Sequence, residues 1–164
     1  MVVVIAEIGI NHNGDLDLCK NMILAAKEAG ATSVKFQKRD PDVCVPEHQK
    51  NVLRETPWGT MTYLEYKHKI EFSKTEYDEI DRYCKELDIR WFLSIWDINS
   101  LHFALLYGNR LVKIPSALAT DTELVRRARS NFDNVIVSVG MCNFKEVANM
   151  VKLFENSKNL ILFY

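Results

Sequence analysis

The stretch SVKFQKRD, residues 33–40, alternates apolar and polar side chains. Val34 and Phe36 are apolar, and Lys35 and Gln37 are interleaved with them. Successive residues of a β-strand point to opposite faces of the sheet, so one face of this short strand is apolar and the other carries an ammonium group and an amide. At an exposed sheet edge this pattern is ordinary. Inside a barrel or a sheet core, Lys35 would be buried and would need a partner.

The rest of the chain repeats the order strand, turn, helix. β-Branched runs and helical apolar spacing predict strands at 2–9, 32–38, 89–97, 110–116, 134–140 and 159–164, and helices at 16–30, 73–88, 98–108, 119–131 and 143–157. Gly30 is predicted to end the first helix, Ser73 and Glu76 to form a capping box, and Thr120 or Asp121 to cap a later helix. Strands that alternate with helices of this length predict a parallel sheet of the α/β class.

Short strands with polar carboxyl ends favour a (β/α)₈ barrel of the TIM type over an open sheet. Such a barrel needs eight strands and ~250 residues, whereas this chain of 164 residues supplies about six strands. We therefore expect residues 1–164 to form a partial barrel, either as a fragment or as an open barrel covered by something else. The long connection of residues 38–72 is expected to contain a short helix and a turn and to cover an active site.

The bulk composition is that of an ordinary globular domain. The 21 basic and 22 acidic residues nearly balance, which does not favour a nucleic-acid or membrane partner. The apolar N-terminus contains Glu7, lacks a basic flank and is shorter than the ~20 residues of a membrane span, so we expect a cytoplasmic protein without a signal peptide. The cysteines are widely separated and form no C-x-x-C pair, so we expect unreactive or buried thiols rather than zinc ligands or disulfides; they are Cys19, Cys44, Cys84 and Cys142.

Polar residues lie at or near the carboxyl ends of five predicted strands: Glu7, Lys35, Gln37, Ser94, Lys113 and Ser138. Outward positions of a barrel strand pack against helices, and the pair Val112 and Ile114, like Val34 and Phe36, fits that role. The polar residues are therefore predicted to point into the barrel at the end where active sites lie.

Two lysines, Lys35 and Lys113, would then face one carboxylate, Glu7. This imbalance predicts a phosphate or carboxylate ligand, with Ser94, Ser116 and Ser138 as neutral donors. In the alternative interpretation, Glu7 pairs with one lysine and the other extends its ammonium group to solvent. His12 in NHNG either binds a ligand or helps to shape a turn that Asn13-Gly14 already favours.

Seven motifs resemble the amino-terminal half of the sialic acid (N-acetylneuraminate) synthase family, which includes legionaminate, pseudaminate and spore-coat polysaccharide relatives. They are AEIGINHNGDLDL (6–18), VKFQKRDPDVCVP (34–46), RETPWGTMTYLEYK (54–67), IEFSKTEYDEIDRYCKE (70–86), WFLSIWD (91–97), KIPSALATD (113–121) and VSVGM (137–141). The resemblance implies a (β/α)₈ barrel followed by an antifreeze-like domain in a domain-swapped homodimer. It also implies condensation of phosphoenolpyruvate with an N-acyl hexosamine such as N-acetylmannosamine, with Mn²⁺ or Mg²⁺ as cofactor.

The resemblance also implies residue roles. Lys35, Lys113, Ser116 and Ser138 would hold phosphoenolpyruvate, and Glu7 and Gln37 would lie near the sugar and metal-bound water. The chain departs from the family in two ways. Leu118 stands where some members carry a glutamate. Nothing matches the last two barrel strands, which carry the histidine metal ligands, or the antifreeze-like domain, so we expect no metal ligands in this chain.

Three hypotheses about function follow. The first is a phosphoenolpyruvate-dependent synthase, with Glu7, Lys35 and Lys113 as catalytic residues and Gln37, Ser94, Ser116, Ser138 and His12 as substrate-binding residues. The second is a Schiff-base aldolase that uses Lys35 or Lys113. The third is a non-catalytic, truncated barrel that binds a small anion or a partner chain.

Overall fold

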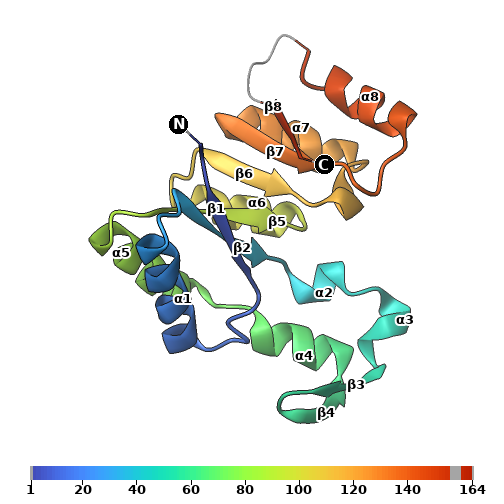
Figure 1. The fold of residues 1–164 in the computed structure, drawn as a ribbon. Coiled ribbons are helices and arrows are strands. Elements are labelled where there is room, and N and C mark those ends of the chain that lie inside the picture. The colour runs from blue at the N-terminus through green and yellow to red at the C-terminus, as the bar shows by residue number, and fades with distance from the viewer. Residues whose placement is uncertain (1, 156–159, 164) are drawn as a thin grey trace. The chain divides into compact units, whose positions relative to one another are not determined.

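The computed structural model of the protein describes residues 2–155 and 160–163 (Figure 1). The chain divides into two compact units between Trp91 and Phe92. The first unit contains β1 (Ile5–Gly9), α1 (Leu16–Glu28), β2 (Ser33–Lys38), α2 (Pro41–Cys44), α3 (Glu47–Lys50), β3 (Leu53–Thr56), β4 (Gly59–Thr62), α4 (Tyr63–Ile70) and α5 (Lys74–Glu86). β5 (Arg90–Ile95) begins just before the boundary. The second unit continues with α6 (Ile98–Leu105), β6 (Leu111–Ile114), the short 3₁₀ helix η1 (Ser116–Leu118), α7 (Thr122–Asn131), β7 (Asn134–Ser138), α8 (Phe144–Lys152) and β8 (Leu160–Phe163).

The paired strands that alternate with the longer helices are parallel. In the first unit β1 pairs with β2, and Glu7 lies opposite Lys35 before the register shifts at Gly9. In the second unit β5 pairs with β6, β6 with β7, and β7 with β8. The predicted α/β class is confirmed, and the six strands lie within the predicted ranges. Residues 156–157, 159 and 164 of the predicted last helix and strand lie outside the described part.

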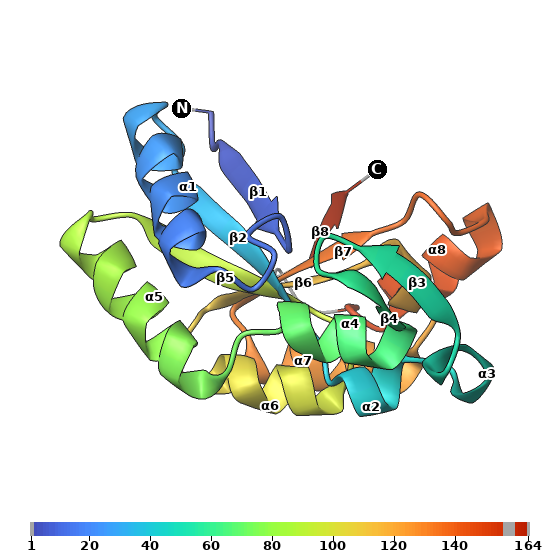
Figure 2. The same cartoon turned by 90° about the horizontal axis from the view of Figure 1, so that it is seen from below.

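The core of the first unit is organised around Phe36, which is fully buried on β2. Its ring lies edge-on to the rings of Tyr77 and Trp91, with centroid distances of 6.3 and 6.1 Å. Tyr77 and Trp91 stack at 5.8 Å, and the Trp91 indole donates a hydrogen bond to Asp81 over 3.0 Å. Helix α5 supplies Tyr77 and Asp81, and α1 packs beside it (Figure 2). These contacts confirm that the Val34 and Phe36 face of β2 packs against helices.

The second unit shows the same division of strand faces. Val112 and Ile114 of β6 are fully buried, whereas Leu111 and Lys113 between them are partly exposed. Helix α7 contributes Leu124 to the buried set. The apolar parity that the sequence predicts for β6 is therefore confirmed.

The predicted helix ends are confirmed where the sequence names a cap. Gly30 follows α1 with a φ of +81°. Ser73 and Glu76 form a capping box on α5, in which the Ser73 N–H donates to the Glu76 carboxylate over 2.7 Å. Asp121, rather than Thr120, caps α7. Each of these helix ends depends on residues within a few positions of it, which is why it can be predicted from the sequence.

The connection between β2 and α5 contains more structure than a short helix and a turn. Besides the short helices α2 and α3, it holds the antiparallel hairpin β3–β4 and then α4, which begins at a capping box between Thr62 and Glu65 (Figures 1 and 2). The hairpin was not predicted because its strands are largely exposed and polar, as at Arg54 and Thr60, and so lack an apolar alternation.

Two further expectations concern the whole chain. In the part of the chain that the structure describes, no helix is both long and apolar enough to traverse a bilayer. All four cysteines are free thiols. Cys19 and Cys84 are buried, which agrees with the prediction, and burial raises the pKa of each to about 12.

Gly14, in the turn that follows β1, offers a stability test. Its φ is +73°, and a Cβ at this position would collide with the backbone carbonyl oxygen of Lys69. Gly30 has a similar φ of +81° but open space around it. Gly30→Ala should therefore cost only the left-handed strain of about 1–2 kcal/mol. Gly14→Ala should cost a further ~1–3 kcal/mol because backbone has to move.

Urea denaturation followed by tryptophan fluorescence measures both losses on the same scale. Equal losses of unfolding free energy in Gly14→Ala and Gly30→Ala would show that the Lys69 backbone moves away from the new Cβ at no cost.

Candidate active site

Lys35 is buried at the centre of β2, with only 6% of its side chain exposed. Its neighbours in sequence, Val34 and Phe36, are fully buried on the opposite face of the strand. The ammonium group therefore lies on the strand face that does not carry the aromatic core. This is the position that the alternation in residues 33–40 predicts.

Glu7 is the acidic residue that lies opposite Lys35. The two are register partners on β1 and β2, and the Lys35 Nζ lies 3.6 Å from Glu7 Oε1. The Glu7 side chain is 54% exposed, so water screens this ion pair and its contribution to stability is small. For Lys35 the geometry agrees with the interpretation in which Glu7 pairs with one lysine. Binding of a phosphate or carboxylate ligand at Lys35 stays a prediction.

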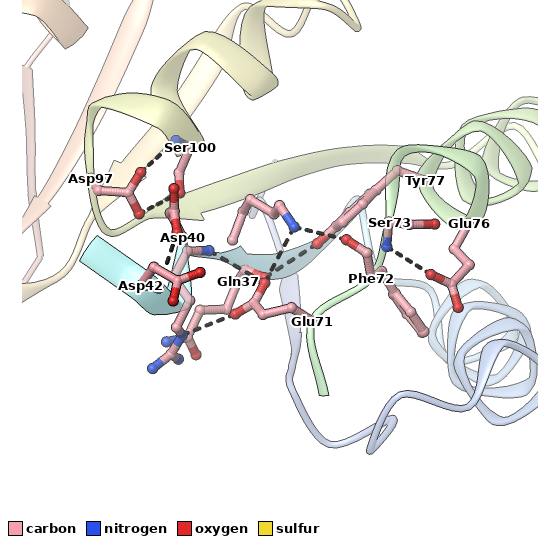
Figure 3. Close-up of polar contacts among 12 residues, drawn as sticks. Gln37, Asp40, Asp42, Glu71, Phe72, Ser73, Glu76, Tyr77, Asp97 and Ser100 are labelled. Atoms are coloured by element: carbon pink, nitrogen blue, oxygen red, sulfur yellow. Dashed lines mark hydrogen bonds and ion pairs between the residues drawn. The ribbon is translucent and has the colours of Figure 1, made fainter. Parts of the chain in front are cut away.

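Gln37 follows on the same strand face and is half-buried. Its backbone carbonyl accepts a hydrogen bond from the Tyr77 hydroxyl over 3.2 Å, which ties this end of β2 to α5 (Figure 3). The carboxyl end of β2, where the candidate residues lie, is thus held by a helix rather than left as a free edge.

A buried charge cluster at this end of β2 was missed by the sequence analysis. The Glu71 side chain is buried and forms two ion pairs. Its Oε1 lies 3.0 Å from Nε of Arg39, and its Oε2 lies 3.5 Å from Nζ of Lys38. Lys38 also donates to the backbone carbonyl of Phe72 over 2.7 Å (Figure 3). Burial raises the pKa of Glu71, while the two cations oppose that shift. The only sequence signal was the pair Lys38-Arg39 directly after the strand, and nothing local linked it to a carboxylate more than thirty residues away.

His12 lies in the turn after β1 and is almost completely buried, with 1% exposed. Its ring stacks on Phe72 at 3.9 Å, and its Nδ1 accepts a hydrogen bond from the Gly14 N–H over 3.1 Å. Burial lowers the pKa of His12 from 6.5 to about 4, against smaller opposing effects of the Gly9 backbone, Glu76 and Asp15. These contacts give His12 a role in shaping the turn. A role in binding substrate stays a prediction.

In the second unit, the predicted residues share one face of the sheet. Ser94 of β5 and Lys113 of β6 are register partners, and Lys113 is paired in turn with Ile136 of β7. Ser138 lies two residues after Ile136 and therefore on the same face. Ser94 is buried, whereas Lys113 and Ser138 are partly exposed.

Lys113 and Ser116 flank the end of β6. The Lys113 ammonium lies 5.2 Å from the centre of the Phe163 ring of β8, a cation–π contact. Ser116 begins the short helix η1 directly after Pro115 and is partly exposed. A cation and a hydroxyl are thus presented at the carboxyl end of the strand, where a (β/α) barrel binds its ligands.

We find no metal centre in the described part of the chain. Within residues 2–155 and 160–163, no group of three or more histidine, cysteine, aspartate or glutamate side chains is placed to hold a metal ion. The described residues do not by themselves fit the Mn²⁺ or Mg²⁺ site that the resemblance implies.

Parallel strands that alternate with helices, with lysines and serines at their carboxyl ends, define the class of TIM-barrel-type α/β proteins. The model of the NeuB family matches residues 22–163, and the chain belongs to this family.

Curated relatives agree with the family assignment. The chain is 34% identical over 158 residues to the N-acetylneuraminate-9-phosphate synthase of Drosophila melanogaster, an alignment that covers 95% of this chain and 42% of the relative. It is 35% identical over 150 residues to the N,N'-diacetyllegionaminic acid synthase of Legionella pneumophila, covering 88% of this chain and 41% of the relative. The chain therefore spans about two fifths of the length of these relatives.

A solved structure confirms the fold class. The N-acetylneuraminic acid synthetase of Leptospira borgpetersenii superposes with a TM-score of 0.84 at 27% identity, covering 98% of this chain and 53% of the other. The six parallel strands thus match about half of a TIM-barrel synthase, as predicted.

Lys35→Met tests whether the buried ammonium serves the fold. Because Glu7 is half exposed, removal of the ammonium leaves a carboxylate in water rather than one buried alone. A buried ammonium has a desolvation cost on the order of several kcal/mol. Methionine is similar in length and does not have this cost. We expect the free energy of unfolding of Lys35→Met to equal or exceed that of the parent in urea denaturation. A loss of more than about 2 kcal/mol would identify Lys35 as a structural residue.

The lowered pKa of His12 predicts acid sensitivity. Its pKa is about 4 in the folded protein and about 6.5 in the unfolded chain, so the unfolded chain binds more protons between these values. The stabilisation is complete above pH 6.5 and is lost as the pH falls towards 4. The loss between pH 7 and 5 should be on the order of 2 kcal/mol.

His12→Asn should remove this component, and His102→Asn, which alters an exposed histidine of α6, should retain it. Urea denaturation at pH 7 and 5 measures the difference. The same pH dependence in His12→Asn and in the parent would show that His12 is not its source.

Proposed function

We propose that the protein acts in a condensation of phosphoenolpyruvate with an N-acyl hexosamine, such as N-acetylmannosamine, that forms a nonulosonic acid. Membership of the NeuB family supports this proposal, as does the similarity to N-acetylneuraminate-9-phosphate synthase and N,N'-diacetyllegionaminic acid synthase. The observation that carries it is the burial of Lys35, a lysine of β2 whose side chain is 6% exposed beside the half-exposed carboxylate of Glu7 on β1. A ligand with two anionic groups suits such lysines through charge-assisted hydrogen bonds.

The proposed chemistry needs charge stabilisation throughout. C3 of phosphoenolpyruvate forms a bond to the aldehyde carbon of the sugar, and a water oxygen adds at C2. The tetrahedral intermediate then breaks its C2–O bond to phosphate and releases inorganic phosphate. Lys35 and Lys113 are proposed to donate to the phosphate and carboxylate oxygens of phosphoenolpyruvate during these steps.

The remaining predicted residues are proposed to orient the substrates. Ser94, Ser116 and Ser138 supply hydroxyl donors from the second unit. Glu7 and Gln37, on adjacent strands of the first unit, are proposed to contact the sugar or a water molecule. A homodimer and a cytoplasmic location belong to the same proposal.

A thermal melt with phosphoenolpyruvate tests the binding step. We expect phosphoenolpyruvate to raise the Tm of the parent. Lys35→Met and Lys113→Met should each lose about 1.5–3 kcal/mol of binding free energy. That loss is a roughly 10- to 150-fold increase in Kd. Lys74→Met is the matched control, because Lys74 is an exposed lysine that pairs with Asp78 at 2.7 Å on the surface of α5. A parental response in Lys35→Met and Lys113→Met would contradict the proposed site.

Two further measurements separate the three hypotheses. Phosphate release that requires both phosphoenolpyruvate and N-acetylmannosamine supports the synthase. Binding of phosphoenolpyruvate without phosphate release supports a non-catalytic anion-binding chain. Borohydride reduction in the presence of pyruvate traps a covalent adduct only if Lys35 or Lys113 forms a Schiff base, and that result would establish the aldolase instead.

A further inference from the structure

Lys67 of α4 is a buried lysine outside the proposed phosphoenolpyruvate site. Only 7% of the residue is exposed. Its Nζ lies 5.0 Å from the centre of the Tyr63 ring and 4.9 Å from that of Tyr66. Within residues 2–155 and 160–163, no carboxylate lies in ion-pair range of Lys67 and no acceptor takes a hydrogen bond from it. Two aromatic faces are therefore the identified partners of this ammonium group.

The charges near Lys67 are mostly of its own sign. The Arg54 guanidinium lies 5.1 Å from the centre of the same Tyr63 ring. Burial, with smaller contributions from Arg39 and Arg54 and an opposing one from Glu71, lowers the pKa of Lys67 to about 8. Glu71 is itself engaged by the guanidinium of Arg39 and the ammonium of Lys38. One carboxylate is thus shared among several cations.

This arrangement is costly for the protein alone. A buried charge carries a desolvation cost that is repaid only by a close opposite charge or by hydrogen bonds. The two aromatic faces offset only part of that cost, because a cation–π contact is weaker than a close ion pair in a buried site. An anion would repay more, and it would relieve the repulsion between Lys67 and the two arginines.

We propose that Lys67, Arg39 and Arg54 form a binding site for a small oxyanion, a phosphate or carboxylate group. Guanidinium groups favour such ligands because their planar fork matches two oxygen atoms at once. Arg54 lies on the exposed strand β3 and offers contact with solvent, whereas Arg39 and Lys67 are buried. The hairpin β3–β4 and helix α4 thereby gain a binding role that does not include Lys35.

Titration with inorganic phosphate at constant ionic strength, followed by calorimetry or by the ¹⁵N signal of the Lys67 amine, tests the proposal. We expect Lys67→Met to weaken phosphate binding at least tenfold. Arg54→Met, which changes an exposed residue and so spares the core, should weaken it as well. Lys69→Met is the matched control, because Lys69 is an exposed neighbour whose ammonium lies 4.7 Å from the centre of the Trp58 ring. Acetate in place of phosphate shows which class of oxyanion the site prefers.

A second readout shows where the phosphate binds rather than how tightly it binds. Acylation by a small amine-reactive reagent, mapped by mass spectrometry, should be slowed by phosphate at Lys67 and unchanged at Lys69. Phosphate binding that persists in both Lys67→Met and Arg54→Met would overturn the proposal. Binding lost in Lys35→Met but kept in Lys67→Met would also overturn it and assign the anion to the proposed phosphoenolpyruvate site. Failure of phosphoenolpyruvate to bind at Lys35 would leave the Lys67 result intact, so the two proposals fail separately.

Discussion

Strand β2 has to bury both of its faces while carrying a lysine at its centre. On one face, Val34 and Phe36 lie in the aromatic core with Tyr77 and Trp91. On the other face, Lys35 is almost as deeply buried. A parallel strand covered on both sides is usually apolar throughout, so a lysine here carries a desolvation cost that an apolar residue would not. The register of β1 places Glu7 opposite Lys35 and so gives the buried ammonium an acidic partner.

The fold could be predicted from the sequence where its signals are local. Alternation predicted which faces of β2 and β6 are buried, because side-chain direction has a period of two in any strand. Cap residues predicted the start of α5 at Ser73 and the start of α7 at Thr120 or Asp121, of which Asp121 is the cap in the structure. A residue such as Gly30 ends a helix by its own conformational freedom and needs no distant partner.

The site was less predictable because charges find their partners across the fold. Counting two lysines against Glu7 identified the strand edge, but it overlooked Glu71, which lies far along the chain and binds Arg39 and Lys38. The sequence does not single out Lys67, whose ammonium lies over the rings of Tyr63 and Tyr66 only in the folded chain. The two alternatives for His12 also depended on Phe72, some sixty residues away, on which its ring stacks.

The contacts of Lys38 and Arg39 with Glu71 and Phe72 join the first residues of the long connection to its last. The segment from α2 to α4 is therefore closed at its base by this one group of contacts, between the end of β2 and the residues that precede α5. The entropy of closing a loop grows only slowly with its length, so doubling the enclosed segment costs about 0.6 kcal/mol. A change in the length of this segment should therefore cost little stability, while β2 before it and α5 after it stay joined through Glu71 and Phe72.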